Sequence, residues 1–142
     1  MPAPCSSPPA NTLRRRAGPP LARIHTAVVA ADDPVVMLTG PIPPATEKAL
    51  KRSGLTIDDI GAFEINEAFA PVPLAWQAET GAKLDRLNPL GGAIGVGHPL
   101  GGSGAILLTR LVHHMRDNGI RYGLQSMCEA GGMANATILE LL

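Results

Sequence analysis

The sequence is poor in the residues on which nucleic-acid-binding and membrane proteins depend. Aromatic residues make up 3% of the 142 residues, and the formal net charge is zero. Such a chain offers neither a basic surface for phosphates nor rings on which bases can stack, so we expect no nucleic-acid partner. No apolar run reaches the roughly 18–20 residues of a membrane-spanning helix, so we expect no membrane partner either.

Cysteine is also scarce, since the chain contains only Cys5 and Cys128. The two residues form no CxxC pair, and no histidine pair has the spacing of a zinc site, so we expect neither a disulfide framework nor a metal. An unpaired thiol is typical of a reducing compartment, which favours the cytoplasm as the location of this protein.

Composition divides the chain into two parts. Residues 1–20 (MPAPCSSPPANTLRRRAGPP) are rich in Pro, Ser and Arg and poor in bulky apolar side chains, which predicts a disordered leader. From residue 21 the chain is apolar enough to build a core, and a chain of this length fits one domain better than two. We therefore expect one folded domain at residues 21–142.

Strand and helix patterns alternate along this domain. Strands are predicted at 23–30, 62–65, 91–96, 122–128 and 134–141, and helices at 45–53, 69–80 and 103–118. Gly54, Gly81 and Gly119 follow the three helices, at the position where a left-handed residue commonly ends a helix. Ser103 is the expected N-cap of the last helix. The alternation predicts the α/β class, with helices packed on a largely buried sheet.

Polar residues follow or end the predicted strands, where α/β proteins collect their chemistry: Asn66, His98 and Cys128. Each has a structural interpretation, in which Asn66 caps a helix, His98 is incidental to a glycine-rich turn and Cys128 is a buried inert thiol. Alternatively, a thiol beside backbone N–H groups has a lowered pKa and acts as a nucleophile or acid–base group. Glu64 and Glu67 are interpreted as solvated or dipole-stabilising acids, not as a catalytic pair.

The segment GVGHPLGGSG, residues 95–104, places five glycines around His98. Gly97 removes a side chain before the histidine, and Pro99 fixes the backbone after it. The other glycines leave the start of the next helix uncovered, so the imidazole stands on an open ledge that a bulky ligand can approach. The segment lacks the third glycine of a dinucleotide-binding loop and the lysine of a P-loop.

Together and in this order, INEAF (65–69), GGAIGVGHPLGGSG (91–104) and MCEAGGM (127–133) resemble the C-terminal half of the thiolases, which make or cleave β-ketoacyl-CoA. The resemblance covers residues 21–142. It implies the α/β fold of a thiolase C-terminal half, a βαβαβαββ mixed sheet with helices packed on it. It also implies acyl-CoA or acetyl-CoA as substrate, no cofactor other than these coenzyme A thioesters, and an oligomer.

The resemblance implies a role for each polar residue. His98 would activate a nucleophilic cysteine and donate to a substrate oxyanion, and Asn66 would hold a water that completes that oxyanion hole. Cys128 would move the proton at the α-carbon of acetyl-CoA. The backbone N–H of Ala130 would serve a second oxyanion hole. The supporting loops would be formed by Gly97, Pro99 and Gly131.

The sequence also departs from the family. The acyl-accepting cysteine of thiolases belongs to their N-terminal half, and Cys5 lies in a setting unlike that motif. Asn88-Pro89-Leu90 stands where Asn-Val-Asn is usual, and Ala130 replaces the first glycine of the CxGxG turn, where a side chain is tolerated poorly if φ is positive. We therefore expect the chain to be inactive alone.

Three functional interpretations follow from these departures. The chain is the C-terminal part of a thiolase that needs an N-terminal half, or a truncated non-catalytic copy that assembles with other thiolase subunits, or a CoA-binding module. The sequence leaves the substrate open between acetoacetyl-CoA, longer fatty acyl thioesters and steroid side-chain thioesters.

Overall fold

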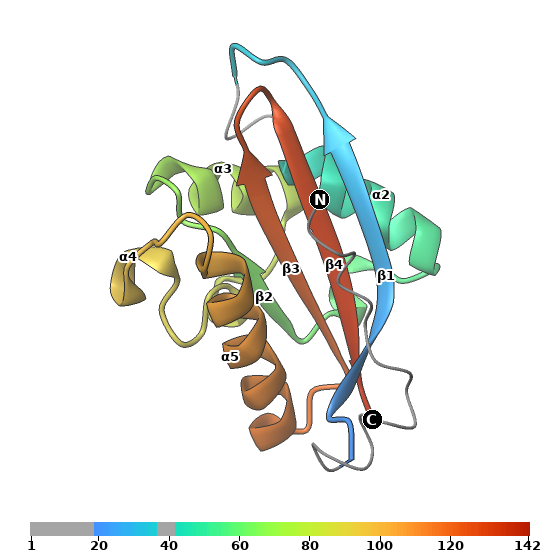
Figure 1. The fold of residues 1–142 in the computed structure, drawn as a ribbon. Helices are drawn as coiled ribbons and strands as arrows, with labels where there is room; N and C mark the ends of the chain where they lie inside the picture. Colours follow the sequence, from blue (N-terminus) through green and yellow to red (C-terminus); the bar gives the residue numbers. More distant parts are fainter. Residues whose placement is uncertain (1–18, 37–41) are drawn as a thin grey trace, which may run out of the picture.

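The computed structural model describes residues 19–36 and 42–142, and the four strands found there form one mixed sheet (Figure 1). The strands are β1 (Ala22–Ala31), β2 (Ala62–Ile65), β3 (Tyr122–Glu129) and β4 (Met133–Leu141), in the order β1-β4-β3-β2. β4 pairs antiparallel with β1 and with β3, whereas β2 runs parallel to β3. Each of these strands lies where the sequence predicts it, to within one residue at either end.

Helices cover both faces of the sheet. α2 (Ile42–Ser53) and α3 (Pro71–Thr80) pack on one face, and α5 (Ser103–Asn118) packs on the other (Figure 1). The alternation of side chains along a strand explains this division, because Phe63 and Leu124 enter the core beneath α2 and α3, whereas Ala62 packs against α5. Gly123 also faces α5, where an added Cβ would lie 2.5 Å from the Met115 sulfur. The helix therefore packs closely on β3.

The helices end where the sequence predicts. Gly54 (φ 75°), Gly81 (φ 68°) and Gly119 (φ 64°) follow α2, α3 and α5 in the left-handed conformation that favours glycine. α2 includes two prolines in its first turn and so begins earlier than the predicted residue 45, because N–H groups in that turn have no helical partner to lose. Short 3-10 turns at Ile57–Asp59 and Leu84–Arg86 lie in the connections. Residues 1–18 of the predicted leader, and residues 37–41, lie outside the described residues.

The strand predicted at 91–96 is wrong, because this stretch contains the short helix α4 (Ala93–Val96). Ile94, which would be buried in a strand, is 64% exposed. The Glu67 carboxylate accepts a hydrogen bond from the Ile94 N–H at 2.9 Å, which stabilises the first turn of a helix at this point. A partner 27 positions away in the sequence therefore decides the conformation of this glycine-rich segment.

A sharp turn before α4 removes most of the third strand that the βαβαβαββ pattern implies. Leu87 forms a single parallel bridge with Phe63. Directly afterwards Asn88 takes φ 45° and Gly91 takes φ 72°, which no strand continues through. The α/β class with a mixed sheet is confirmed, and the third strand of the pattern is reduced to this one bridge.

The start of α5 differs from the predicted one. Gly102 is the N-cap, and Ser103 is the first helical residue. The Ser103 hydroxyl does not bond an N–H group of the helix, because it turns back to the Pro99 carbonyl at 3.0 Å. The buried face of α5 begins at this serine and continues through Leu107, Leu111 and Met115 at a spacing of four residues.

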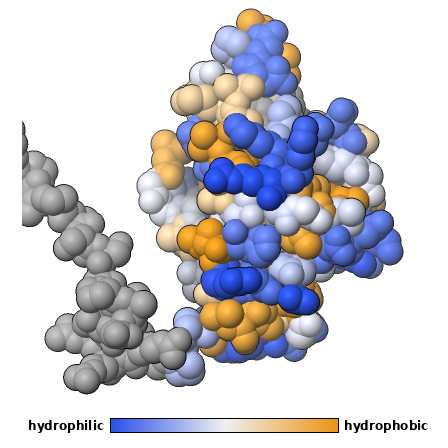
Figure 2. All heavy atoms as spheres, turned by 90° about the vertical axis from the view of Figure 1, so that its right-hand side faces the viewer, coloured by the Kyte–Doolittle hydropathy of each residue, from blue (hydrophilic) through white to orange (hydrophobic). Residues whose placement is uncertain are grey.

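The surface of the domain is mixed. Figure 2 views the side of β1 and α2, on which hydrophobic residues lie in small groups between hydrophilic ones. A further set of exposed apolar side chains, called here the α4–α5 apolar surface, consists of Ile94, Val96, Leu100 and Ile106. Within residues 19–36 and 42–142, every helix is too short or too polar to cross a bilayer.

Candidate active site

Asn66 and Cys128 meet at the carboxyl ends of β2 and β3. The Asn66 N–H donates to the Ser126 carbonyl at 2.9 Å, which continues the parallel pairing one residue beyond β2. The Asn66 Nδ2 lies 3.7 Å from the Cys128 Sγ, within reach of a hydrogen bond to sulfur. Asn66 is 1% exposed, and its Oδ1 has no partner among the described residues, so this acceptor is left for a ligand or water. The capping interpretation is wrong, because Ala70 is the N-cap of α3.

Burial governs the ionisation of the Cys128 thiol. Loss of solvent raises its pKa, and the hydrogen bond from Asn66 only partly offsets that rise. The lowered pKa considered for this thiol is therefore wrong for the structure described. A thiol that stays protonated at neutral pH is suited to donating a proton to carbon rather than to attacking as a thiolate.

Two hydrogen bonds hold the His98 loop, residues 97–102, at these strand ends. The bond from the Ile94 N–H to Glu67 ties α4 to the segment that follows β2. The Gln125 Nε2 of β3 donates to the Gly104 carbonyl at 2.9 Å and ties the first turn of α5 to β3. The loop between α4 and α5 is thus fixed at the end of the sheet that carries the amide and the thiol (Figure 1).

His98 is half-buried at the start of this loop. Its Nδ1 lies 2.7 Å from the Ser103 hydroxyl oxygen. Gly97, which precedes it, takes φ 86° and ψ 155°, a conformation that is open to glycine and costly for other residues. Among the described residues, His98 makes no hydrogen bond to Asn66 or Cys128. The structure therefore brings the amide and the thiol into contact and holds the imidazole on a neighbouring loop.

Asn88 joins the strand ends to the loop, a role that the sequence did not reveal. Its side chain pairs with both polar groups of one residue: Oδ1 accepts from the Ile65 N–H at 2.8 Å, and Nδ2 donates to the Ile65 carbonyl at 3.0 Å. The same Nδ2 donates to Glu67 at 2.9 Å. The sequence offers the pair Asn88-Pro89, which is typical of a turn but does not indicate the partner Ile65.

The hairpin between β3 and β4 places Ala130 at an exposed tip. Among the described residues the Ala130 N–H makes no hydrogen bond, so it is available to a ligand. The positive φ values of the turn fall on Gly131 (84°) and Gly132 (77°), so the alanine carries no strain of the kind expected for it. An added Cβ at Gly132 would lie 2.6 Å from the Asp32 carbonyl, which shows how closely the segment after β1 packs on this tip.

Glu64 is buried on β2, so its interpretation as a solvated acid is wrong. The residue is 1% exposed, and neither carboxylate oxygen has a hydrogen-bond partner among the described residues. Burial raises the pKa of Glu64 to about 7, although the positive charge of Arg110 opposes the rise. Glu67, by contrast, stabilises the start of α4 as a dipole-stabilising acid would.

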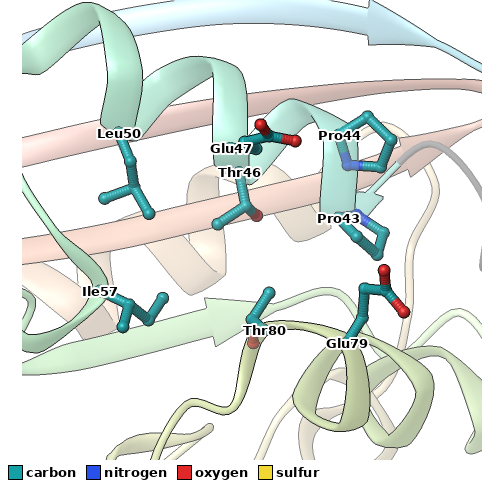
Figure 3. Close-up of a pocket in the computed structure, with 8 residues that line it drawn as sticks. All are labelled: Pro43, Pro44, Thr46, Glu47, Leu50, Ile57, Glu79 and Thr80. Atoms are coloured by element: carbon teal, nitrogen blue, oxygen red, sulfur yellow. The ribbon is translucent and has the colours of Figure 1, made fainter.

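A hollow of about 290 Å³ lies between α2 and α3 (Figure 3). Its lining is aliphatic with two carboxylates at the rim: Pro43, Pro44, Thr46, Glu47, Leu50, Ile57, Glu79 and Thr80. It contains no thiol, imidazole or amide, so it is separate from the site at the strand ends. In the part of the chain that the structure describes, no three His, Cys, Asp or Glu side chains lie close enough to hold a metal ion.

The chain folds as a mixed sheet with helices on both faces, and polar side chains lie at the ends of its strands. This arrangement is that of an α/β domain with a site at the edge of the sheet. The family model "Thiolase, C-terminal domain" matches residues 18–141, so the chain belongs to the thiolase family. The resemblance seen in the three motifs is therefore confirmed.

The chain is similar to thiolases from bacteria and from humans. It is 58% identical over 123 residues to steroid 3-ketoacyl-CoA thiolase FadA6 of Mycobacterium tuberculosis, covering 87% of this chain and 30% of that protein. A crystal structure of human mitochondrial 3-ketoacyl-CoA thiolase matches with a TM-score of 0.86 and 40% identity, covering 94% of this chain and 33% of that one. Another crystal structure of the human enzyme, in complex with CoA, matches equally well. The chain thus spans about a third of the length of these relatives.

Proposed function

We propose that this chain is the C-terminal catalytic part of a thiolase-type acyl-CoA C-acyltransferase, which cleaves β-ketoacyl-CoA by thiolysis or forms it by Claisen condensation. The observation that carries the proposal is the contact between the Asn66 amide and the Cys128 thiol at the sheet end to which the His98 loop is tied. An amide, a thiol and an imidazole at one end of a sheet are the groups that acyl transfer and proton transfer at carbon require.

In the cleavage direction, His98 takes the proton of an acyl-accepting cysteine, and the resulting thiolate attacks the ketone carbonyl. The carbon–carbon bond then breaks, and the electron pair leaves on the α-carbon of acetyl-CoA. The Cys128 thiol donates a proton to that carbon, a role supported by its burial and raised pKa. Asn66 holds the water of one oxyanion hole and the Ala130 N–H serves the other. These roles are supported by the Asn66 Oδ1 and the Ala130 N–H, neither of which has a partner in residues 19–36 and 42–142.

The acyl-accepting cysteine comes from an N-terminal thiolase half in the active assembly, so this chain is inactive alone. The four exposed apolar side chains of the α4–α5 apolar surface lie on the His98 loop and on the two helices beside it, and they support such a partner, because a partner that covers them would remove them from water. CoA thioesters are the substrates, in keeping with the human relative solved in complex with CoA. The Cys128 thiol, which forms no disulfide among the described residues, supports a location in the cytoplasm.

An acetoacetyl-CoA thiolysis assay tests the proposal. The chain alone is expected to give no turnover, and the chain mixed with the separately produced N-terminal half of the Mycobacterium tuberculosis relative is expected to give turnover. His98→Ala and Cys128→Ser should abolish that activity, whereas His113→Ala, on the exposed side of α5, should not. A steroid side-chain thioester is the second substrate, since the relative of that name is 58% identical.

Two results would contradict the proposal. Turnover by the chain alone would mean that it carries its own nucleophile. A mixture that binds the N-terminal half but turns over neither substrate would favour the assembly module over the enzyme.

A further inference from the structure

Ser103 is buried in the first turn of α5 and touches two groups of the His98 loop. Its hydroxyl oxygen lies 2.7 Å from the His98 Nδ1 and 3.0 Å from the Pro99 carbonyl oxygen. That carbonyl also accepts from the Gly102 N–H at 2.9 Å and from the Ser103 N–H at 2.8 Å. The loop between histidine and helix is therefore a closed turn, and the serine hydroxyl sits between its carbonyl and the imidazole.

Counting hydrogens decides the direction of these bonds. A serine hydroxyl has one hydrogen, and a carbonyl oxygen only accepts. If the hydroxyl donated to His98, its oxygen would face the Pro99 carbonyl oxygen at 3.0 Å with no hydrogen between them. If it donates to the Pro99 carbonyl instead, both contacts are hydrogen bonds, and the hydroxyl accepts from the Nδ1–H of His98.

The tautomer of the histidine follows from this direction. A neutral imidazole carries one N–H, and the hydrogen bond at one nitrogen sets the state of the other. We propose that Ser103 is a positioning residue that holds His98 in the Nδ1–H form and leaves the Nε2 lone pair unprotonated. Free histidine side chains favour the opposite form, with the hydrogen on Nε2, so the serine selects the minor tautomer.

The consequence for catalysis rests on the proposed function, but the tautomer itself does not. Nε2 has no hydrogen-bond partner among the described residues, so it is the nitrogen that can take a proton from an acyl-accepting cysteine. The same serine keeps its bond to Nδ1–H after Nε2 is protonated, so the ring need not turn during the reaction. In the other tautomer the free lone pair would be on Nδ1. That nitrogen faces the Ser103 hydroxyl inside the turn, so it could not take a proton from the cysteine.

Nitrogen-15 NMR of the whole chain, labelled at its histidines, tests the proposal without a substrate. At a pH at which the imidazole is neutral, His98 Nδ1 is expected to give a pyrrole-type shift and Nε2 a pyridine-type shift. His98→Gln assigns the signals by removing them. In Ser103→Ala, the shifts should move toward the Nε2–H form. Ser103→Thr, which keeps a hydroxyl, should restore the wild-type pattern.

Thr109→Ala is the matched control, because this hydroxyl lies on the same helix and donates to the Ala105 carbonyl, away from His98. It should leave the His98 shifts unchanged. A wild-type His98 with the hydrogen on Nε2, or identical shifts in wild type and Ser103→Ala, would overturn the proposal.

Kinetics with an N-terminal half give a second readout. Ser103→Ala is expected to lower kcat a few-fold with little change in KM, because a free imidazole favours the Nε2–H form only modestly and only the fraction of His98 in the Nδ1–H form acts as base. Ser103→Thr should regain most of that loss. An unchanged kcat in Ser103→Ala would contradict the positioning role. If no mixture turns over, that result counts against the proposed function, and the NMR measurement decides the tautomer.

Discussion

Glu64 lies on a buried strand beside apolar neighbours, and neither of its oxygens has a partner in the described part of the chain. Its nearest charged influences are Arg110 of α5, which favours the carboxylate, and Glu67, which disfavours it. Desolvation is the larger effect, so the neutral acid is the more stable form up to about neutral pH. The residue therefore links the stability of the domain to pH.

We expect Glu64→Gln to stabilise the domain above neutral pH. The pKa of Glu64 is about 7 in the folded chain and near 4.5 in the unfolded one, so the folded state holds the proton more tightly. Stability consequently falls as the pH rises from 4.5 to about 7 and stays low above that, by up to about 3 kcal/mol. Urea denaturation at about pH 5 and about pH 8 should show a smaller pH-dependent loss in Glu64→Gln than in wild type.

The exposed Glu79→Gln is the control and should keep the wild-type loss. Equal losses in wild type and Glu64→Gln would show that the carboxyl group is hydrated in the folded chain.

At the scale of elements, regular strands and long helices were predictable because their signals are local. Short runs of apolar and β-branched residues indicated β1 to β4, and glycines after the helical patterns indicated the helix ends. The segment 91–96 was not predictable in this way, because its conformation depends on Glu67, a residue distant in the sequence. The role of Asn88 was hidden for the same reason, since its amide bonds Ile65 across 23 positions.

The candidate site shows the same limit. The ends of the predicted strands and the order of three motifs pointed to Asn66, His98 and Cys128, and the structure brings two of them into contact. The direction of the thiol pKa could not be predicted, because it depends on how deeply the end of β3 is buried. The buried position of Ser103 and its bond to His98 were also hidden, because the sequence suggested an N-cap.

We expect Asn88→Ala to destabilise the domain by about 2–4 kcal/mol, because it leaves the N–H and C=O of Ile65 without partners and places alanine at φ 45°. Asn88→Gly relieves the backbone cost but not the lost bonds, so its loss should be smaller. Chemical denaturation measures both. Asn118→Ala, at the exposed end of α5, should change stability by no more than about 0.5 kcal/mol. Similar values for Asn88→Ala and Asn118→Ala would show that the Ile65 groups find other partners.

At the scale of the whole molecule, the α4–α5 apolar surface is the feature most out of keeping with a monomer. Leu100, on the loop that carries His98, is 89% exposed. The partner proposed for this chain would cover the surface, and without that partner the same side chains are available to a second copy.

We therefore expect the isolated chain to self-associate at high concentration. Leu100→Glu should shift light-scattering or sedimentation measurements toward the monomer, because it places a charge in the contact. Leu74→Glu, a change of the same kind on α3, should have little effect. An isolated wild-type chain that stays monomeric, or a Leu74→Glu variant that dissociates equally well, would contradict this assignment of the contact.

The Asn88 side chain, which pairs with Ile65, also affects whether copies of this chain can associate through the edges of their sheets. By filling the hydrogen-bonding positions at the end of β2, it denies an incoming strand the backbone groups it would need there. On the opposite border of the sheet, Lys48 Nζ donates to the Val29 carbonyl at 2.8 Å, so this acceptor on β1 is also occupied. Aggregates of this domain should therefore be reversible clusters held by side chains, not cross-β fibrils that bind thioflavin T.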